Sequence, residues 1–193
     1  MKVEALTGAA RTQALDDVAR LRIAVFRDWP YLYDGSLAYE RQYLEPYRDN
    51  PRAVLAVARD GDAIVGAATG TPMEDHAEEF ASAFAHSGLN LSDIFYCAES
   101  VLLARYRGQG IGHRFFDIRE AHARSLGRRY VAFCAVQRPD DHPAKPADYR
   151  PLDGFWRARG YSPLQGVRAR FRWKDLGDSA ETEKPLQFWM REL

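Results

Sequence analysis

Residues 94–118 read IFYCAESVLLARYRGQGIGHRFFDI, in which an apolar run, a turn with three glycines and a second apolar run follow directly on one another. The first run has the length and the aliphatic and aromatic content of a buried strand, so we expect one continuous strand over residues 94–103. The second run has helical spacing from Ile111 and ends at Gly127, a residue type that commonly follows a helix. The stretch therefore predicts a strand, a glycine turn and a helix in succession.

The glycine turn, residues 107–112, predicts a binding site for an anion. Its three glycines leave backbone N–H groups bare at the start of the helix. Such groups have no partner within the helix, and together with the positive end of the helix dipole they attract phosphate. Arg105, Arg107 and Arg114 surround the turn before the first acid, Asp117. We therefore expect a phosphate or pyrophosphate group to bind here.

The order of residues in this turn separates three kinds of phosphate-binding loop. A nucleoside-triphosphate loop needs Gly-Lys followed by Ser or Thr, which occurs nowhere in the chain. A dinucleotide loop needs a third glycine where His113 stands, and an acid about twenty residues further on, near Arg128. The pattern Arg107-x-x-Gly110-x-Gly112 resembles instead the Arg/Gln-x-x-Gly-x-Gly/Ala motif of the GNAT superfamily, the coenzyme A-dependent N-acetyltransferases. A glycine turn without any ligand is the alternative that the turn alone leaves open.

The composition indicates one ordinary globular domain. The chain has 193 residues, of which 46% are hydrophobic and 12% aromatic, enough for a well-packed core. Its formal net charge is zero, which argues against nucleic acid as a partner. Two cysteines imply no disulfide framework, and neither the N-terminus nor the longest apolar run, residues 53–58, resembles a signal or membrane segment. We expect a cytoplasmic protein without a membrane partner.

Hydrophobic spacing and turn residues predict the order of the other elements. Asp60-Gly61 between two apolar runs, for example, is typical of a hairpin turn. The predicted elements are a strand at 2–6, a helix around 15–25, a helix at 37–47, hairpin strands at 53–58 and 63–68, an inserted helix at 73–87, a strand at 130–136, a helix at 152–159, and strands at 167–173 and 185–191.

This order resembles that of the GNAT superfamily over nearly the whole chain. Residues 155–161, Phe-Trp-Arg-Ala-Arg-Gly-Tyr, also resemble the family segment that ends in Gly and an aromatic residue. The resemblance implies an α+β fold: a single GNAT-like domain over residues 1–193, with a central mixed, mostly antiparallel twisted sheet of about seven strands and helices on both faces. The helical insert at about 73–91 is longer than the family's plain connection. A lid or a subunit contact of a homodimer is left open for it.

The resemblance also implies acetyl-CoA as the co-substrate and a primary amine, on a small molecule or a peptide, as the acceptor. In the family, the strand before the glycine turn separates from its neighbour, and pantetheine lies in the gap. Carried over residue by residue, the backbones of Val101, Leu102 and Leu103 pair with pantetheine. The backbone that holds the pyrophosphate is then that of Arg107, Gly108, Gln109, Gly110, Ile111, Gly112 and His113.

Glu99 is the candidate general base for the acceptor amine. By strand alternation it shares a face with Phe95, Cys97, Val101 and Leu103, an apolar setting of the kind that raises the pKa of a carboxyl group. A base that titrates near neutral pH suits the deprotonation of an amine. The alternatives that the residues leave open are a structural ion pair and a side chain redirected by a bulge in the strand.

The proton donor departs from the family pattern. Many members have a tyrosine where this chain has Trp156, and an indole does not give up a proton at ordinary pH. Tyr149 and His142 are the candidates to replace it. The departure keeps a second function open, a non-catalytic acyl-CoA-binding sensor or interaction module of the same fold. No metal site is expected, because Asp140, Asp141 and His142 are consecutive and flanked by prolines.

The acceptor is expected to enter between the first two helices and the last two strands. Residues 27–34 and Tyr39, Tyr43 and Tyr47 are dense in aromatic rings there. Such rings hold amines by stacking and cation–π contact, and they also serve ordinary packing.

Overall fold

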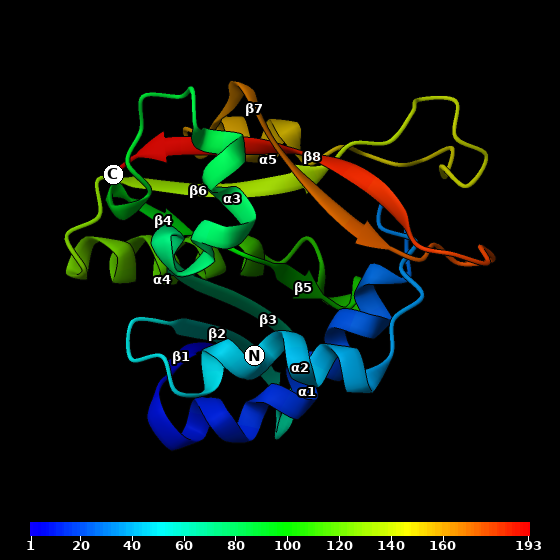
Figure 1. Cartoon of the computed structure of the whole chain (residues 1–193). Helices are drawn as coiled ribbons and strands as arrows, with labels where there is room; N and C mark the ends of the chain where they lie inside the picture. Colours follow the sequence, from blue (N-terminus) through cyan, green and yellow to red (C-terminus); the bar gives the residue numbers. More distant parts are fainter.

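A twisted sheet of eight strands crosses the molecule (Figure 1), and the computed structural model describes all 193 residues. The strands lie in the order β1-β2-β3-β4-β6-β8-β7, with β5 also paired to β3. Every pair is antiparallel except β4 and β6, which are parallel. The predicted mixed, mostly antiparallel sheet is thus confirmed. The strands are β1 (Lys2–Leu6), β2 (Val54–Asp60), β3 (Ala63–Pro72), β4 (Ile94–Tyr96), β5 (Ser100–Leu102), β6 (Tyr130–Val136), β7 (Ser162–Trp173) and β8 (Thr182–Glu192).

Helices cover both faces of this sheet (Figure 1). The helices are α1 (Gly8–Phe26), α2 (Leu37–Arg48), α3 (Ala77–Phe84), α4 (Ile111–Ser125) and α5 (Asp153–Ala158), and short 3-10 turns are η1 (Met73–His76), η2 (Leu91–Asp93) and η3 (Ala104–Tyr106). The two faces separate by strand alternation. Leu55 of β2 packs with α1 and α2, whereas its neighbour Ala56 packs with α4. Cys134 of β6 packs with α3, and Phe133 packs with α4 and α5. The predicted α+β domain with helices on both faces is confirmed.

Residues 94–103 do not form the single strand that their apolar content predicts. Tyr96 lies opposite Thr71 of β3, but Ser100 lies opposite Ala68, so one extra residue stands between the two pairs. The Ala98 N–H donates to the Thr69 oxygen at 3.2 Å. The Thr69 N–H donates to the Glu99 oxygen, also at 3.2 Å, so Ala98 and Glu99 both face Thr69. Two residues facing one define a β-bulge, which separates β4 from β5. The prediction of one continuous strand is therefore wrong, and the sheet gains an eighth strand.

The bulge also separates β5 from β6. β4 pairs with β6, and the last bond between these segments runs from the Cys97 N–H to the Ala132 oxygen at 2.8 Å. Beyond this point β5 pairs with β3 only, whereas β6 pairs with β8 only. The two strands diverge, and a gap opens in the middle of the sheet.

The insert at 73–91 packs onto the sheet. It forms a 3-10 turn and a helix that ends at Phe84, so the helix predicted over 73–87 is shorter than expected. The ring of Phe80 lies 4.8 Å from that of Tyr96 and 5.2 Å from that of Phe188, and Phe84 lies 4.9 Å from Phe188. The insert therefore covers the face of β4, β6 and β8 and contributes to the core.

Candidate active site

The glycine turn has the geometry of an anion-binding loop. Gly108 and Gly110 have φ angles of 77° and 76°, in the left-handed region that favours glycine. α4 begins directly after Gly110, and no side chain caps its first N–H groups. A Cβ atom at Gly108 or Gly110 would meet nothing within 4 Å, and one at Gly112 would meet only the ring of Phe155, at 3.4 Å. The first turn of α4 is therefore open to a ligand on its N–H side.

The charges around the turn favour an anion. The first turn of α4 contains no acid. Arg105, Arg107 and Arg114 are exposed around it, and the Arg107 Nε atom donates to the Leu102 oxygen at 3.3 Å. Asp117, the first acid in α4, forms an ion pair with Arg159 at 2.7 Å. Positive charge therefore predominates at the turn, as the sequence predicts.

Only part of the strand before the turn offers free backbone groups to the gap. The Leu103 N–H donates to the Val65 oxygen at 3.1 Å, and the Glu99 oxygen accepts from β3. Because peptide groups alternate along a strand, those of Glu99, Val101 and Leu103 face β3, and those of Ser100 and Leu102 face away from it. Of the three residues expected to pair with pantetheine, only Leu102 turns its peptide groups away from β3, and its oxygen already accepts a hydrogen bond from Arg107.

Glu99 lies in a buried ionic cluster, and the apolar setting expected for it is wrong. An Arg22 Nη1 atom lies 2.7 Å from the Glu99 Oε2 atom, the Thr69 hydroxyl donates to Oε1 at 2.7 Å, and the Arg22 Nε atom donates to Glu40. The three charged residues are all buried, and Tyr43 stacks on the guanidinium at 4.0 Å. Two carboxylates thus share one guanidinium between α1, α2 and β5, which leaves the cluster with an excess negative charge.

The bulge explains why strand alternation predicted the wrong neighbours for Glu99. One extra residue reverses the faces of a strand. Phe95 and Cys97, before the bulge, pack on the α4 face, and Val101, after it, packs on the face of α1 and α2. Glu99 pairs with Arg22 of α1, and so shares the face of Val101 rather than that of Phe95 and Cys97.

Arg119 of α4 fixes the bulge, a role that sequence reasoning missed. Its side chain is buried, and its guanidinium donates to the oxygens of Thr69 at 3.3 Å and Glu99 at 3.0 Å and to the Ser100 hydroxyl at 2.8 Å. No carboxylate pairs with it. An arginine inside a helix gives no signal in the sequence, because its partners are backbone atoms of other elements.

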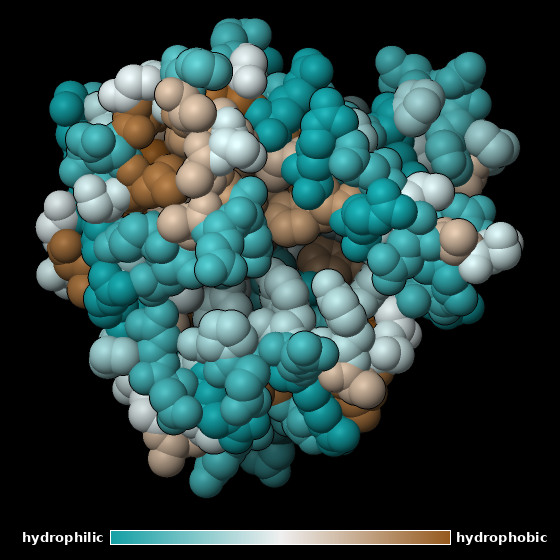
Figure 2. All heavy atoms as spheres, in the orientation of Figure 1, coloured by the Kyte–Doolittle hydropathy of each residue, from teal (hydrophilic) through white to brown (hydrophobic).

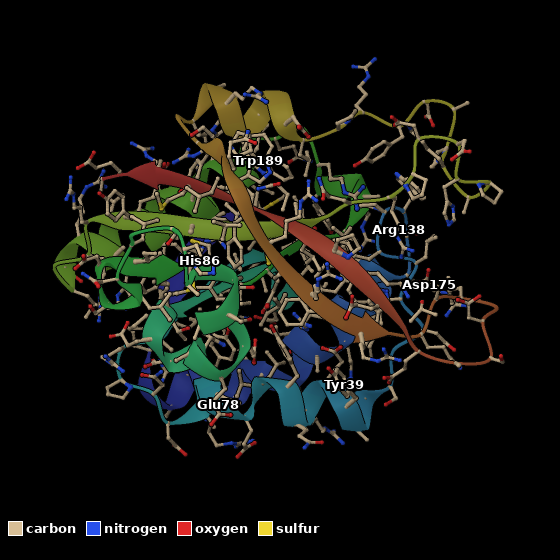
Figure 3. The ribbon with its side chains drawn as sticks, turned by 45° about the horizontal axis from the view of Figure 1, so that its top comes forward. Tyr39, Glu78, His86, Arg138, Asp175 and Trp189 are labelled. Atoms are coloured by element: carbon tan, nitrogen blue, oxygen red, sulfur yellow. The ribbon has the colours of Figure 1, made fainter.

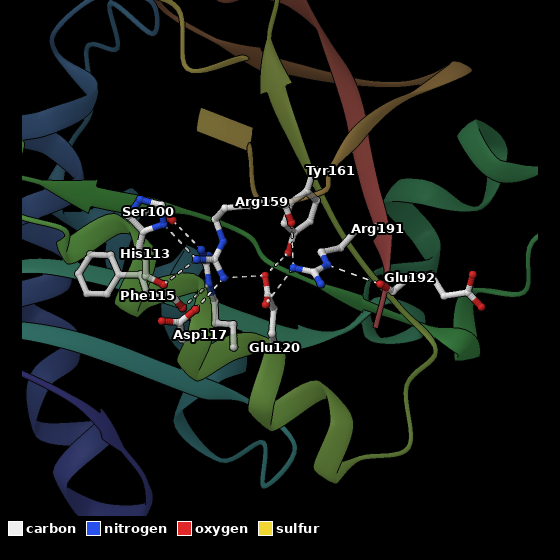
Figure 4. A network of polar contacts seen from close by, with 10 residues as sticks. Ser100, His113, Phe115, Asp117, Glu120, Arg159, Tyr161, Arg191 and Glu192 are labelled. Carbon is white, nitrogen blue, oxygen red and sulfur yellow. Dashed lines mark hydrogen bonds and ion pairs between the residues drawn. The ribbon is translucent and has the colours of Figure 1, made fainter. Parts of the chain in front are cut away.

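A second network joins the start of α4 to α5 and β8 (Figure 4). Arg159 donates to Asp117 at 2.7 Å and to Glu120 at 3.1 Å, and its Nη1 atom lies 3.2 Å from the His113 Nδ1 atom. Tyr161 donates its hydroxyl to Glu120 at 2.9 Å. These contacts hold the first turns of α4, and hence the glycine turn, in a fixed orientation.

Trp156 offers no proton to the gap. Its ring packs between those of Phe133 at 4.9 Å and Trp189 at 5.2 Å. The candidate substitutes His142 and Tyr149 lie against Trp29, at 5.1 and 5.9 Å between ring centroids, and so border the segment between α1 and α2.

Cys134 does not have the properties of a nucleophile. Burial raises the pKa of its thiol to about 12, an effect larger than the opposing hydrogen bond with Tyr96. Cys134 is therefore a thiol rather than a thiolate at neutral pH.

The acceptor side combines a hollow surface with aromatic rings. Figure 2 shows a hydrophobic hollow near the middle of one face, between β7 and α2. Tyr31, between α1 and α2, lies 4.4 Å from Phe26 and 5.8 Å from Trp173 of β7, and Tyr33 lies 6.5 Å from Tyr39 of α2. Of the predicted aromatic residues, the structure thus brings Tyr31 next to β7. No group of His, Cys, Asp and Glu side chains is arranged to hold a metal ion, and no helix is long and apolar enough to cross a bilayer.

Comparison with known proteins agrees with this geometry. The model of the acetyltransferase (GNAT) family matches residues 18–147, so the chain belongs to the GNAT family. No curated protein matches the chain.

Solved structures show the same fold at low sequence identity. A ribosomal-protein-alanine N-acetyltransferase from Brucella melitensis has 14% identity and a TM-score of 0.62, with 100% of both chains covered. An aminoglycoside 6'-N-acetyltransferase in complex with coenzyme A has 16% identity and a TM-score of 0.60, covering 100% of this chain and 97% of that one. A polyamine N-acetyltransferase from Drosophila melanogaster has 11% identity and a TM-score of 0.60, with 100% of both chains covered.

Proposed function

We propose that the protein transfers an acetyl group from acetyl-CoA to a primary amine, by direct attack of the amine in a ternary complex. One observation carries the proposal: β5 does not pair with β6, and the chain runs from β5 through η3 and the glycine turn into the uncapped start of α4. A strand edge with free peptide groups and a phosphate-binding turn match the two polar parts of coenzyme A. Membership of the GNAT family supports the same reading.

The residues of the turn would hold the pyrophosphate. The N–H groups after Gly110 point out of α4 without partners, and Arg107 and Arg114 add positive charge. Leu102 and Ser100 would pair with pantetheine through the peptide groups that face the gap. Coenzyme A in the related aminoglycoside acetyltransferase structure supports this choice of ligand.

Glu99 remains the proposed base. It lies on the bulge, next to the peptide groups of Ser100 and on the face of α1 and α2, where the acceptor is expected. Its carboxylate would accept a proton from the ammonium group, directly or through water, so that the nitrogen attacks the thioester carbon. The attacking nitrogen then releases its second proton to water as the C–S bond breaks, and the thiolate leaves with the electron pair of that bond. Because Trp156 cannot protonate it, the thiolate takes its proton from water.

The acceptor is proposed to be a cationic amine. The excess negative charge of the cluster of Arg22, Glu40 and Glu99 favours a cation nearby. Tyr31 and Tyr33 add aromatic surface to the same side. The related structures include enzymes that are named for an alanine terminus, an aminoglycoside and a polyamine, which all carry amines.

Trp156 favours one alternative, a sensor that binds acyl-CoA without transfer. The two functions are separated by a screen of primary amines with acetyl-CoA, read by release of free thiol and by mass spectrometry of the product. Acetylated product is expected. Binding of acetyl-CoA without any product would support the sensor.

Ligand binding tests the cofactor choice separately. Coenzyme A should raise the melting temperature by mass action, whereas NAD should not, because the turn lacks the third glycine of a dinucleotide loop. Equal stabilisation by both ligands, or by neither, would contradict the assignment.

A further inference from the structure

Arg138 joins residues 29–34, the segment between α1 and α2, to Asp175 in the connection between β7 and β8. Figure 3 labels both Arg138 and Asp175. Arg138 follows β6 and is largely buried, with 8% of its side chain exposed. Its Nε atom donates to the Pro30 oxygen at 2.9 Å, and its Nη2 atom donates to the Tyr31 oxygen at 2.7 Å. One guanidinium therefore holds two successive carbonyl groups of a segment that has no helix or strand of its own.

Asp175, in the connection between β7 and β8, completes the attachment. It accepts from Arg138 at 2.6 and 2.9 Å, a bidentate pair, and lies 3.2 Å from the Lys184 Nζ atom. The Trp173 indole donates to the same Tyr31 oxygen at 3.0 Å. Arg138, Asp175 and Lys184 are termed the Arg138 clamp below.

Backbone bonds continue the attachment beyond the clamp. The Leu176 N–H donates to the Leu32 oxygen at 2.7 Å, and the Asp34 N–H donates to the Lys174 oxygen at 2.9 Å. Residues 29–34 are thus bonded to Arg138, after β6, and to the β7–β8 connection. In Figure 1 these three segments meet at one end of the molecule.

The clamped segment carries side chains toward the ionic cluster of Glu99. The Tyr31 ring lies between Phe26 of α1 and Trp173 of β7. Burial raises the pKa of the Tyr31 hydroxyl, and the positive charge of Arg22 opposes this effect. Phe26 lies 5.0 Å from the Arg22 guanidinium, so the Tyr31 ring packs beside this ionic cluster, although the clamp holds only its backbone.

We propose that the Arg138 clamp fixes residues 29–34 as a rigid wall of the acceptor site, with Tyr31 as the residue that contacts the acceptor, and so determines which amines are acetylated. This inference rests on the proposed acetyltransferase function. Arg138 is a positioning residue: it is neutralised by Asp175 and acts on the acceptor only through the segment that it holds. The wall should favour amines that fit the fixed ring and reject bulkier ones.

The test compares Arg138→Ala with the unchanged protein on primary amines of increasing bulk, from ethanolamine through tyramine to a lysine-containing peptide. KM for the preferred amine should rise roughly tenfold, because bonds to a charged group are lost and the wall is no longer ordered. Discrimination against the bulkiest amine should fall by a similar factor, and the Kd of coenzyme A should stay unchanged. Arg170→Ala is the matched control, since this exposed arginine of β7 pairs only with Glu183 and should alter none of these values.

Two further variants keep the test decisive if Arg138→Ala folds poorly. Arg138→Lys keeps the charge without the planar fork and should recover only part of the selectivity. Tyr31→Ala leaves the ion pair intact and should reproduce the loss of selectivity, with no additional loss in the double variant. An enzyme whose selectivity and KM survive both Arg138→Ala and Tyr31→Ala would overturn the inference while the acetyltransferase function stands. If the unchanged protein acetylates no amine, the proposed function fails first and the inference falls with it.

Discussion

Arg22 lies between two buried carboxylates, and this arrangement allows catalysis and stability to be tested separately. Removing the charge of either Glu40 or Glu99 leaves one guanidinium and one carboxylate, a balanced pair. Removing Arg22 leaves two buried charges of the same sign without a partner. Neutralising one carboxylate should therefore change the stability little, whereas removing Arg22 should lower it.

Glu99→Gln and Glu40→Gln form a matched pair of variants. Both should unfold at temperatures close to that of the unchanged protein. If Glu99 is the base, only Glu99→Gln should lower kcat, by roughly a hundredfold or more at neutral pH, with the loss shrinking at high pH where free amine is abundant. Steady-state rates across pH would show this. Equal kinetics for the two variants would assign Glu99 a structural role.

Arg22→Met should destabilise the protein by roughly 3–5 kcal/mol, the usual cost of breaking a buried ion pair by removing one partner. Arg20→Met is the control in the same helix. Arg20 is exposed and pairs with Asp16 and Asp17 at the surface, where such pairs contribute about 0–1 kcal/mol. Urea unfolding of both variants measures the difference, and similar losses would contradict the cluster.

At the scale of elements, α4 begins and ends with a left-handed glycine. Gly110 has φ 76° at the start and Gly127 has φ 69° at the end, and a Cβ atom would have free space at either position. Both glycines therefore have a positive φ angle, which is unfavourable for a residue with a side chain. They differ in what their surroundings offer to a ligand, because only Gly110 adjoins uncapped N–H groups.

Gly110→Val should abolish coenzyme A binding, and Gly127→Val should not. Both variants place a branched residue at positive φ and should lose comparable stability, on the order of 1–2 kcal/mol each. Only the first would block the approach of a phosphate group to the start of α4. Calorimetric titration with coenzyme A measures this, and full affinity in folded Gly110→Val would refute the pyrophosphate site.

At the scale of the whole molecule, stability in acid depends on contacts between distant segments. Burial disfavours the charged form of Asp175, but hydrogen bonds from Arg138 and Lys184 outweigh this effect and lower its pKa below the usual value of 3.8. A carboxyl group with a lowered pKa in the folded state stabilises the protein above its unfolded pKa. That contribution is lost as the pH falls through the folded pKa.

Asp175→Asn should therefore destabilise the protein at neutral pH, where it leaves Arg138 and Lys184 without a carboxylate. The difference from the unchanged protein should shrink progressively below about pH 4 as Asp175 itself becomes protonated. Unfolding by urea from pH 7 to pH 2 measures both curves. Parallel curves over this range would show that Asp175 is not paired in solution.

Local patterns in the sequence were enough to predict the order of the elements and the glycine turn. Periodicity and turn residues depend on neighbours along the chain, so the hairpin at Asp60-Gly61, β6 and the start of α4 at Ile111 were predicted from local patterns. The motif from Arg107 to Gly112 pointed to the GNAT family for the same reason, because its chemistry lies in consecutive backbone atoms.

The way in which the chain surrounds the gap depends on contacts between residues that are far apart in the sequence. The bulge at Ala98 and Glu99 arises from register against β3, and a one-residue shift reverses every face beyond it. Arg119 and Arg138 bind backbone oxygens that lie far away in the sequence. Interactions of this kind leave no periodic signal, because a buried arginine and its partner carbonyl groups are brought together only when the strands and helices pack.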